Sequence, residues 1–176
     1  MSQPSPEFTN NTIDTAQLPR FENVAFRPLE KSYLKVLLIN FLIVVAVISM
    51  LVVASYIFVS DFSDFVPWVF IIPGAVLAIV GTFSFIGFYK QGFAFREHDV
   101  LYKSGVISTN IIIIPYNRVQ HVALHEGPFS RIFGLSEIRI YTAGGGSGDI
   151  AIPGILATEA QGIKQLLMGK IQKPLA

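Results

Sequence analysis

Two long apolar segments dominate the pattern of hydrophobic and polar positions along the chain. Residues 36–59 and 65–89 contain no Asp, Glu, Lys, Arg or His, and only residues 60–64 separate them. A helix needs roughly 20 apolar residues to cross a bilayer, so the pattern predicts two transmembrane helices packed as an antiparallel hairpin. A soluble domain of this length could not bury two such helices on all sides, and a cleaved signal peptide has a shorter apolar run.

The chain before the first segment lacks this apolar pattern. Residues 1–22 are rich in Ser, Thr, Asn, Gln and Pro, which predicts a disordered N-terminal tail. In residues 23–35, apolar side chains alternate with charged ones around Pro28. This juxtamembrane segment suits two interpretations, a stretch that lies at the level of the lipid headgroups or an unstructured lead-in to the first span.

After Lys90 the pattern changes to short alternating runs that predict β-strands. The runs are rich in β-branched and aromatic residues, are separated by turn residues, and cover residues 92–96, 100–103, 109–114, 119–126, 138–142 and 149–152. Five or six closely spaced strands without intervening helices predict an antiparallel sheet that curls over its own core as a β-barrel.

A helical period returns near the C-terminal end. Thr158 and Gln161 form a capping-box pair, and Pro174 lies beyond the predicted end of the helix. The predicted apolar face consists of Ala160, Ile163, Leu166, Leu167 and Ile171. The pattern predicts a single helix that covers one opening of the barrel, in a domain that spans residues 90–173.

The distribution of charge predicts the orientation of the hairpin. Basic residues flank the two segments at the ends away from their connection. Arg27, Lys31 and Lys35 precede the first segment, and Lys90 and Arg96 follow the second. The connection between the segments carries Asp61 and Asp64 and no basic residue. The positive-inside rule therefore predicts that both termini lie in the cytoplasm.

Composition fits a small membrane protein and excludes several chemistries. The 176 residues are 52% hydrophobic and 14% charged, with a formal net charge of +1. The sequence has no cysteine, which excludes disulfides, thiolate nucleophiles and cysteine-based zinc sites. It also has no cluster of Lys and Arg, so no nucleic-acid partner is expected.

Small residues within the second segment predict a helix-packing strip. Gly74, Ala78 and Gly81 follow one another at i, i+4 and i+7, a spacing at which another helix can approach closely. We expect the strip to pack against the first segment of the same chain, with a contact between copies in a homo-oligomer as the alternative. Neither segment carries a charged group for a transport pathway, and Pro73 predicts a kink in the second.

Candidate catalytic and metal-binding residues do not complete a motif. On one face of a strand His121 and His125 would lie about 13 Å apart, too far to share an ion, and His98 lies on a separate turn. The glycine run at residues 144–148 lacks the Lys-Ser or Lys-Thr of a phosphate-binding loop. The sequence therefore predicts no catalytic residue, no cofactor and no metal ion.

Three successive runs in the β-rich region resemble a known family. They are residues 113–122 (IIPYNRVQHV), 126–135 (EGPFSRIFGL) and 141–146 (YTAGGG). Together they resemble the bacterial membrane-flanked pleckstrin-homology-like (PH-like) domain family, in its YdbS-like type with two transmembrane helices ahead of one domain. The resemblance implies a seven-stranded bent sheet capped by a C-terminal helix, on the cytoplasmic side of a bacterial plasma (inner) membrane, with no established catalytic activity. It also suggests a helical turn at residues 129–133.

The predicted fold class is thus an α+β membrane protein, in which a two-helix transmembrane hairpin precedes a PH-like antiparallel β-barrel with a C-terminal helical cap. This architecture favours a non-enzymatic, membrane-anchored interaction or scaffold module. We expect a membrane-protein partner, for which a larger protein with repeated PH-like domains is one candidate. The residues predicted to contact a partner are Arg118, Arg131, Arg139 and Tyr141. Arg118 has a structural alternative, in which it fixes the turn at residues 115–117.

Other functions stay open from sequence. An accessory subunit of a membrane transport or export assembly would act through the hairpin. A weak binder of anionic lipid would use basic residues near the leaflet, although the turn at residues 97–99, Glu-His-Asp, lacks the basic residues that phosphoinositide-binding relatives carry in their first hairpin loop. An enzyme that acts on lipid would need a pocket with a perturbed acid or base.

Overall fold

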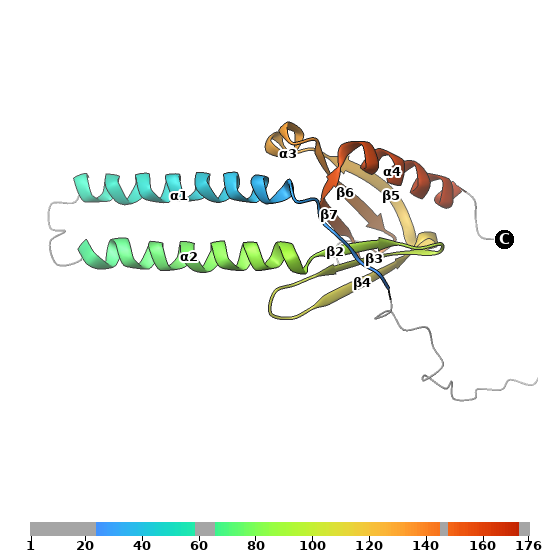
Figure 1. Ribbon diagram of the computed structural model, residues 1–176, viewed down its shortest axis with the longest axis horizontal. Helices are drawn as coiled ribbons and strands as arrows, with labels where there is room; N and C mark the ends of the chain where they lie inside the picture. The colour runs from blue at the N-terminus through green and yellow to red at the C-terminus, as the bar shows by residue number, and fades with distance from the viewer. Residues whose placement is uncertain (1–23, 59–65, 145–147, 173–176) are drawn as a thin grey trace, which may run out of the picture.

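The computed structural model describes residues 24–58, 66–144 and 148–172. Two long helices lie side by side at one end and a β-rich domain lies at the other (Figure 1). The helices are α1 (Tyr33–Phe58), α2 (Val66–Lys90), α3 (Pro128–Ile132) and α4 (Ala157–Gln172), with a 3₁₀ turn η3 (Tyr116–Arg118). The strands are β1 (Arg27–Pro28), β2 (Gly92–Phe95), β3 (Asp99–Ser104), β4 (Asn110–Pro115), β5 (Val119–His125), β6 (Leu135–Thr142) and β7 (Ile150–Leu156).

Some sequence predictions fall on residues outside these ranges. They are the predicted tail at residues 1–22, the connection at residues 60–64, most of the glycine run, and Pro174.

The helices α1 and α2 are each long and apolar enough to cross a membrane. Their most apolar windows have mean hydropathies of 3.1 and 2.4, and almost none of either window is buried by the rest of the chain. At 1.5 Å per residue, the 26 residues of α1 extend about 39 Å, against about 30 Å for the hydrocarbon core. The prediction of two membrane-spanning helices is confirmed.

Part of the segment before α1 pairs with the β-rich domain, which the alternative of an unstructured lead-in did not include. Arg27 pairs with Phe93 and Pro28 with Gly92, so β1 forms an antiparallel edge strand beside β2. Leu29, next along the chain, is only 3% exposed and belongs to the core. Proline is tolerated here because an edge strand leaves one side of its backbone unpaired. The transmembrane hairpin therefore connects two adjacent paired strands.

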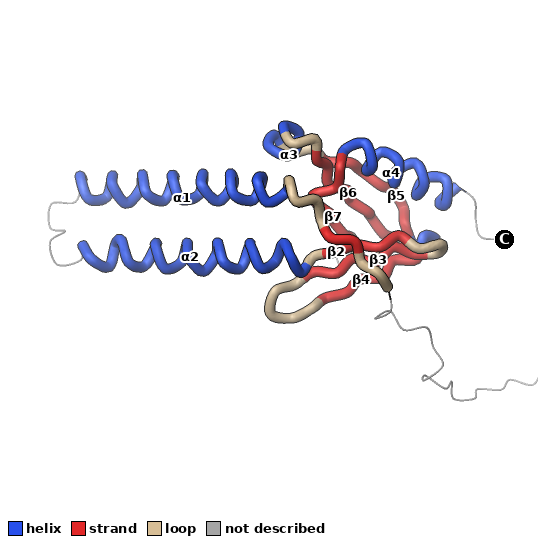
Figure 2. Tube along the Cα trace, viewed as in Figure 1, coloured by secondary structure: helices blue, strands red, loops and turns tan. Residues whose placement is uncertain are grey.

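The strands form two antiparallel sheets, with orders β1-β2-β3-β4 and β5-β6-β7 (Figure 2). The predicted antiparallel β-structure is confirmed, but it does not close into a barrel: in the described part of the chain β4 pairs only with β3, and β5 only with β6. The chain leaves one sheet at Pro115 and enters the other after η3. One backbone hydrogen bond, from Glu30 N to Gly154 O at 2.9 Å, joins the β1 segment to β7.

The core lies between the inner faces of the two sheets and α4. Its fully buried members come from several strands and the helix, and they are Val100, Ile138, Ile140, Ile152, Ala160 and Leu167. The C-terminal helix covers the sheet as predicted (Figure 1). It begins at Ala157, so the N-cap position is Leu156 and Thr158, the predicted cap, lies two residues further on in the first turn. Leu166 is exposed and does not belong to the buried face.

Candidate interaction surfaces

The outer face of the second sheet brings together two of the four residues predicted to contact a partner. Side chains alternate along a strand, so Arg139 and Tyr141 point away from the core, on the same face as Glu137. The Arg139 guanidinium donates a 2.5 Å hydrogen bond to Glu137, which raises the pKa of Arg139. The ring of Tyr141 stacks on that of its cross-strand neighbour His121, with centroids 4.2 Å apart. These polar groups are already paired with one another.

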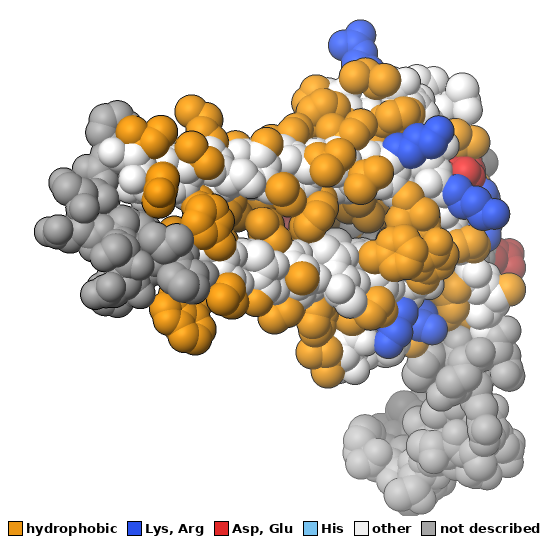
Figure 3. All heavy atoms as spheres, turned by 60° about the vertical axis from the view of Figure 1, so that its left-hand side comes forward, with side chains coloured by type: hydrophobic (Ala, Val, Ile, Leu, Met, Phe, Trp, Pro, Cys, Tyr) orange, Lys and Arg blue, Asp and Glu red, His pale blue; other side chains and the backbone are white. Residues whose placement is uncertain are grey.

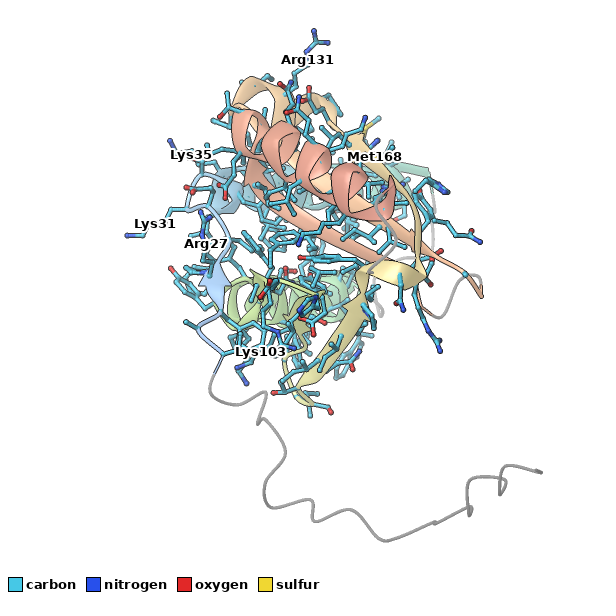
Figure 4. The ribbon with its side chains drawn as sticks, turned by 90° about the vertical axis from the view of Figure 1, so that its right-hand side faces the viewer. Arg27, Lys31, Lys35, Lys103, Arg131 and Met168 are labelled. Carbon is cyan, nitrogen blue, oxygen red and sulfur yellow. The ribbon has the colours of Figure 1, made fainter. Side chains whose placement is uncertain are left out.

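Arg118 and Arg131 lie away from this pair. The exposed Arg118 lines a hollow of about 230 Å³ at the end of β4, together with residues of the β6–β7 connection. Its backbone oxygen accepts a hydrogen bond from Ala143 N at 3.0 Å. Arg131 is on α3 and extends outward from the molecule (Figure 4). The four residues therefore do not form one site, and their role as partner contacts stays a prediction.

The free edge of β4 is a surface that the sequence did not predict. Among the described strands β4 pairs on one side only, with β3, where all six of its residues have register partners. Its sequence, Asn-Ile-Ile-Ile-Ile-Pro, has no charged side chain, and Ile113 is 43% exposed. Edge strands are usually protected by charge, by brevity or by a covering element. The run of four isoleucines was the available signal, but only the topology shows that this strand lies at an edge.

Among the ionisable groups of the described domain, two buried tyrosines have the most strongly shifted pKa values. Burial raises the pKa of Tyr102 to about 12, and its hydroxyl lies 3.4 Å from the Gln91 side-chain oxygen. Burial also raises the pKa of Tyr116 to about 12, and its hydroxyl donates to Arg96 O at 2.6 Å. Both hydroxyls stay protonated at neutral pH and act as hydrogen-bond donors that join segments of the first sheet.

A cleft of about 470 Å³ lies where the helices meet the two sheets. Side chains of α1 and α2 form one wall, including Tyr33 and Phe88, and Tyr102, Glu137 and Pro153 contribute from the strands. The wall residues Tyr33 and Phe88 also contact each other, with ring centroids 6.4 Å apart. The cleft is the joint between the hairpin and the domain.

The histidines considered for metal binding lie apart. His121 stacks on Tyr141, His125 lines a small hollow beside α1, and His98 is on the β2–β3 turn. Within residues 24–58, 66–144 and 148–172, no three His, Asp or Glu side chains come close enough to hold a metal ion.

The turn that carries His98 is the second hairpin connection of the first sheet, because the transmembrane hairpin, which joins β1 to β2, forms the first.

The predicted helix-packing strip behaves differently at its two ends. A Cβ placed on Gly81 would lie 3.0 Å from the ring of Phe41, so α1 packs closely against α2 at this point. A Cβ on Gly74 would meet nothing within 4 Å, and Ala78 is exposed. The Gly81 end thus packs within the chain, and a contact between copies at Gly74 stays a prediction.

Comparison with known proteins agrees with this architecture. The family model described as "Bacterial PH domain" matches residues 16–171, which include β1, both long helices and every later strand. The transmembrane protein YdbS of Bacillus subtilis (strain 168) is 26% identical over 106 residues, covering 57% of this chain and 67% of YdbS. No solved structure matches the chain. The resemblance seen in the sequence is confirmed, and the chain belongs to the bacterial PH domain family.

Proposed function

We propose that this membrane protein is a non-enzymatic interaction module, which holds its PH-like domain on the cytoplasmic face of a bacterial plasma membrane and receives an extended segment of a membrane-protein partner along β4. The unpaired edge of β4 carries this proposal. An extended peptide that adds to a sheet edge gains main-chain hydrogen bonds along its length, and side-chain pockets give it specificity.

The surroundings of β4 suit such a segment. Alternate residues of this six-residue strand direct their backbone groups to the unpaired side, and the exposed Ile113 offers apolar contact. Beyond Pro115, the hollow beside Arg118 lies where the added segment would continue. The exposed guanidinium of Arg118 is suited to a carboxylate of the partner, which it can bind through two parallel hydrogen bonds.

The charge pattern supports the proposed orientation. Lys31, Lys35 and Lys90 lie at the domain-side ends of α1 and α2, and basic residues that flank spans favour the cytoplasmic side.

The attachment of the domain to both spans supports a membrane-bound partner. Both β1 and β2 lead directly into the spans, so the domain is held at two points and its β4 edge keeps a fixed direction relative to the bilayer. Confinement to the membrane raises the effective concentration of other membrane proteins, so a short edge contact is sufficient. A larger protein with repeated PH-like domains fits this description, and a second copy of the chain is the alternative occupant.

Substitution of Ile113 by Lys tests the proposal, because a charge in the middle of a flat edge opposes strand addition. The chain is purified in mild detergent at native expression. Its complex is then compared with free chain by hydrogen exchange of residues 110–115. We expect a stable complex with newly protected β4 amides in the wild type, and loss of the complex in Ile113→Lys.

The matched control is Met168→Lys, which places the same charge at a site of similar exposure, 38%, on α4. It should leave the complex intact. Recovery of the wild-type chain alone, without a partner or self-association, would refute the proposal. So would a complex that forms equally well with Ile113→Lys.

A further inference from the structure

The two most exposed isoleucines of the domain lie on either side of the transmembrane hairpin. Ile107 is 88% exposed, in the connection between β3 and β4, and Ile132 is 73% exposed, at the end of α3. Both segments reach past the domain-side ends of α1 and α2 (Figure 1). Large apolar side chains this exposed mark a contact surface when they adjoin other apolar surface.

The β3–β4 connection is fixed against α2. The Lys90 ammonium donates a 2.7 Å hydrogen bond to Val106 O, and the Val106 side chain lies 3.3 Å from the position of a Cβ on Gly87. Gly105 has φ +110°, and a Cβ there would lie 1.9 Å from Ser108 O. The connection therefore makes a tight, glycine-dependent turn that presents Ile107 beside the helix.

The position of Val106 along α2 sets the depth of this connection. Lys90 ends the helix and, as a charged residue, lies at the level of the headgroups. Gly87 comes three residues earlier, which is about 4.5 Å closer to the centre of the bilayer at 1.5 Å per residue. The contact of Val106 with Gly87 thus places the neighbouring Ile107 near the boundary between headgroups and acyl chains.

The α3 segment is held in the same way against α1. The Lys35 ammonium lies 5.6 Å from the centre of the Phe133 ring, which follows α3. A hollow of about 190 Å³ is lined jointly by Val36 and Asn40 of α1 and by Gly127 and Ser130. α3 therefore lies alongside the first two turns of α1, where the apolar segment begins.

Basic residues accompany both segments. Lys31, Lys35 and Arg27 lie at one side of the domain, and Arg131 and Lys103 lie above and below them in the view along the hairpin (Figure 4). Apolar side chains continue from the helices onto the adjoining part of the domain (Figure 3). Apolar tips flanked by basic groups suit an anionic lipid surface, which attracts Lys and Arg at its headgroups and accepts apolar side chains beneath them.

We propose that Ile107 and Ile132 insert into the leaflet on the domain's side of the membrane, so that the domain rests on anionic phospholipid at both flanks of the hairpin. The two spans anchor the domain in the bilayer, and the contacts at Ile107 and Ile132 stop the domain from tilting. This surface is separate from the β4 edge, and the inference does not depend on the proposed protein partner.

Single-cysteine labelling tests the insertion, and the absence of cysteine from the sequence makes it direct. Ile107→Cys, Ile132→Cys and, as the control on the opposite part of the domain, Met168→Cys each receive an environment-sensitive nitrobenzoxadiazole label. The full chain is placed as single copies in nanodiscs of phosphatidylglycerol and phosphatidylethanolamine, with or without phospholipid that carries a nitroxide on the upper acyl chain.

We expect the labels at positions 107 and 132 to emit at shorter wavelength, to lose most of their fluorescence to the nitroxide lipid and to be protected from iodide in solution. The label at 168 should show the opposite behaviour. Because the discs contain only lipid and one chain, a protein occupant cannot produce this quenching. Quenching at 107 and 132 no stronger than at 168 would overturn the proposal, and quenching at one of them alone would overturn the two-sided contact.

Discussion

Gly154 is the residue at which a single added methyl group should loosen the joint between hairpin and domain. It lies in β7 with φ +65°, and an ideal Cβ there would lie 2.8 Å from Cγ and 2.9 Å from Cβ of Tyr33, the first residue of α1. Its backbone oxygen also accepts the hydrogen bond from Glu30 N. The change Gly154→Ala therefore meets both an unfavourable backbone conformation and a steric overlap.

The size of the effect follows from these two causes. A side chain in the left-handed region costs about 1–2 kcal/mol, and forcing an extra methyl into a packed contact costs about 1–3 kcal/mol. Tyr33 begins a membrane-spanning helix and cannot move far, so the domain must shift instead. The two costs together, about 2–5 kcal/mol, should lower the free energy of locally opening the Glu30 to Gly154 hydrogen bond. Hydrogen exchange at Glu30 N should then be faster by a factor on the order of 30 to 4,000.

Hydrogen exchange with mass spectrometry on the full chain in nanodiscs measures this opening directly. Peptides that contain Glu30 should exchange faster in Gly154→Ala, whereas peptides from α4 should not change. The control is Gly162→Ala, since a Cβ at Gly162 meets nothing within 4 Å. Alanine in the middle of a helix should be neutral or stabilising by about 0.5–1 kcal/mol.

A double-mutant cycle with Tyr33→Ala measures the contribution of the ring. Removing the ring should relieve the overlap with Cγ and leave both the overlap with the Tyr33 Cβ and the backbone part of the Gly154→Ala penalty, giving a coupling of about 1 kcal/mol. The reasoning is refuted if Gly154→Ala exchanges like the wild type at Glu30. It is also refuted if its penalty is unchanged in the Tyr33→Ala background, because the overlap with the ring would then not exist.

Three further variants probe other contacts. Burial raises the pKa of Tyr116 to about 12 from about 10 in the unfolded chain. The protonated hydroxyl therefore contributes fully to the free energy of unfolding below pH 10, and this contribution is lost as the pH rises toward 12. Tyr116→Phe should make the melting temperature decline less steeply over this range. Glu159→Gln removes the exposed ion pair with Arg27 and should cost less than about 1 kcal/mol, a loss that 1 M salt reduces in thermal melts. Gly81→Leu should destabilise the hairpin by about 1–3 kcal/mol in detergent unfolding, whereas Gly74→Leu should be tolerated unless it disrupts a dimer seen by cross-linking.

Most of the fold could be predicted from the sequence because its elements have strong local signals. The two spans follow from the length of uninterrupted apolar sequence, and the strands of the domain follow from alternation. The exception is β1, which has two residues and contains Pro28, so it has no period to detect. Its position is set by pairing with β2 across the whole hairpin. Closure of a barrel likewise depends on pairing between distant strands, which local alternation does not specify.

The candidate surfaces were less predictable for a related reason. The proximity of Arg139 and Tyr141 follows from their i, i+2 spacing on one strand, so it could be predicted from the sequence. Whether β4 lies at an edge depends on the order of strands in the sheet. The exposure of Ile107 and Ile132 depends on where the β3–β4 connection and α3 lie relative to α1 and α2. A single hydrophobic residue in a turn or a short helix has no pattern that distinguishes a buried side chain from an exposed one.

Because the transmembrane hairpin lies in the chain between two paired strands, insertion into the membrane assists folding of the domain. Pro28 and Gly92 pair directly although they are about 64 residues apart, and closing a flexible loop of that length costs about 4 kcal/mol. Once α1 and α2 span the bilayer as neighbours, their domain-side ends are already close, so β1 and β2 meet without this cost. A fragment that begins at Gly92 would lack β1 and the buried Leu29, and would leave the edge of β2 and part of the core uncovered. We therefore expect insertion of the hairpin to precede completion of the domain.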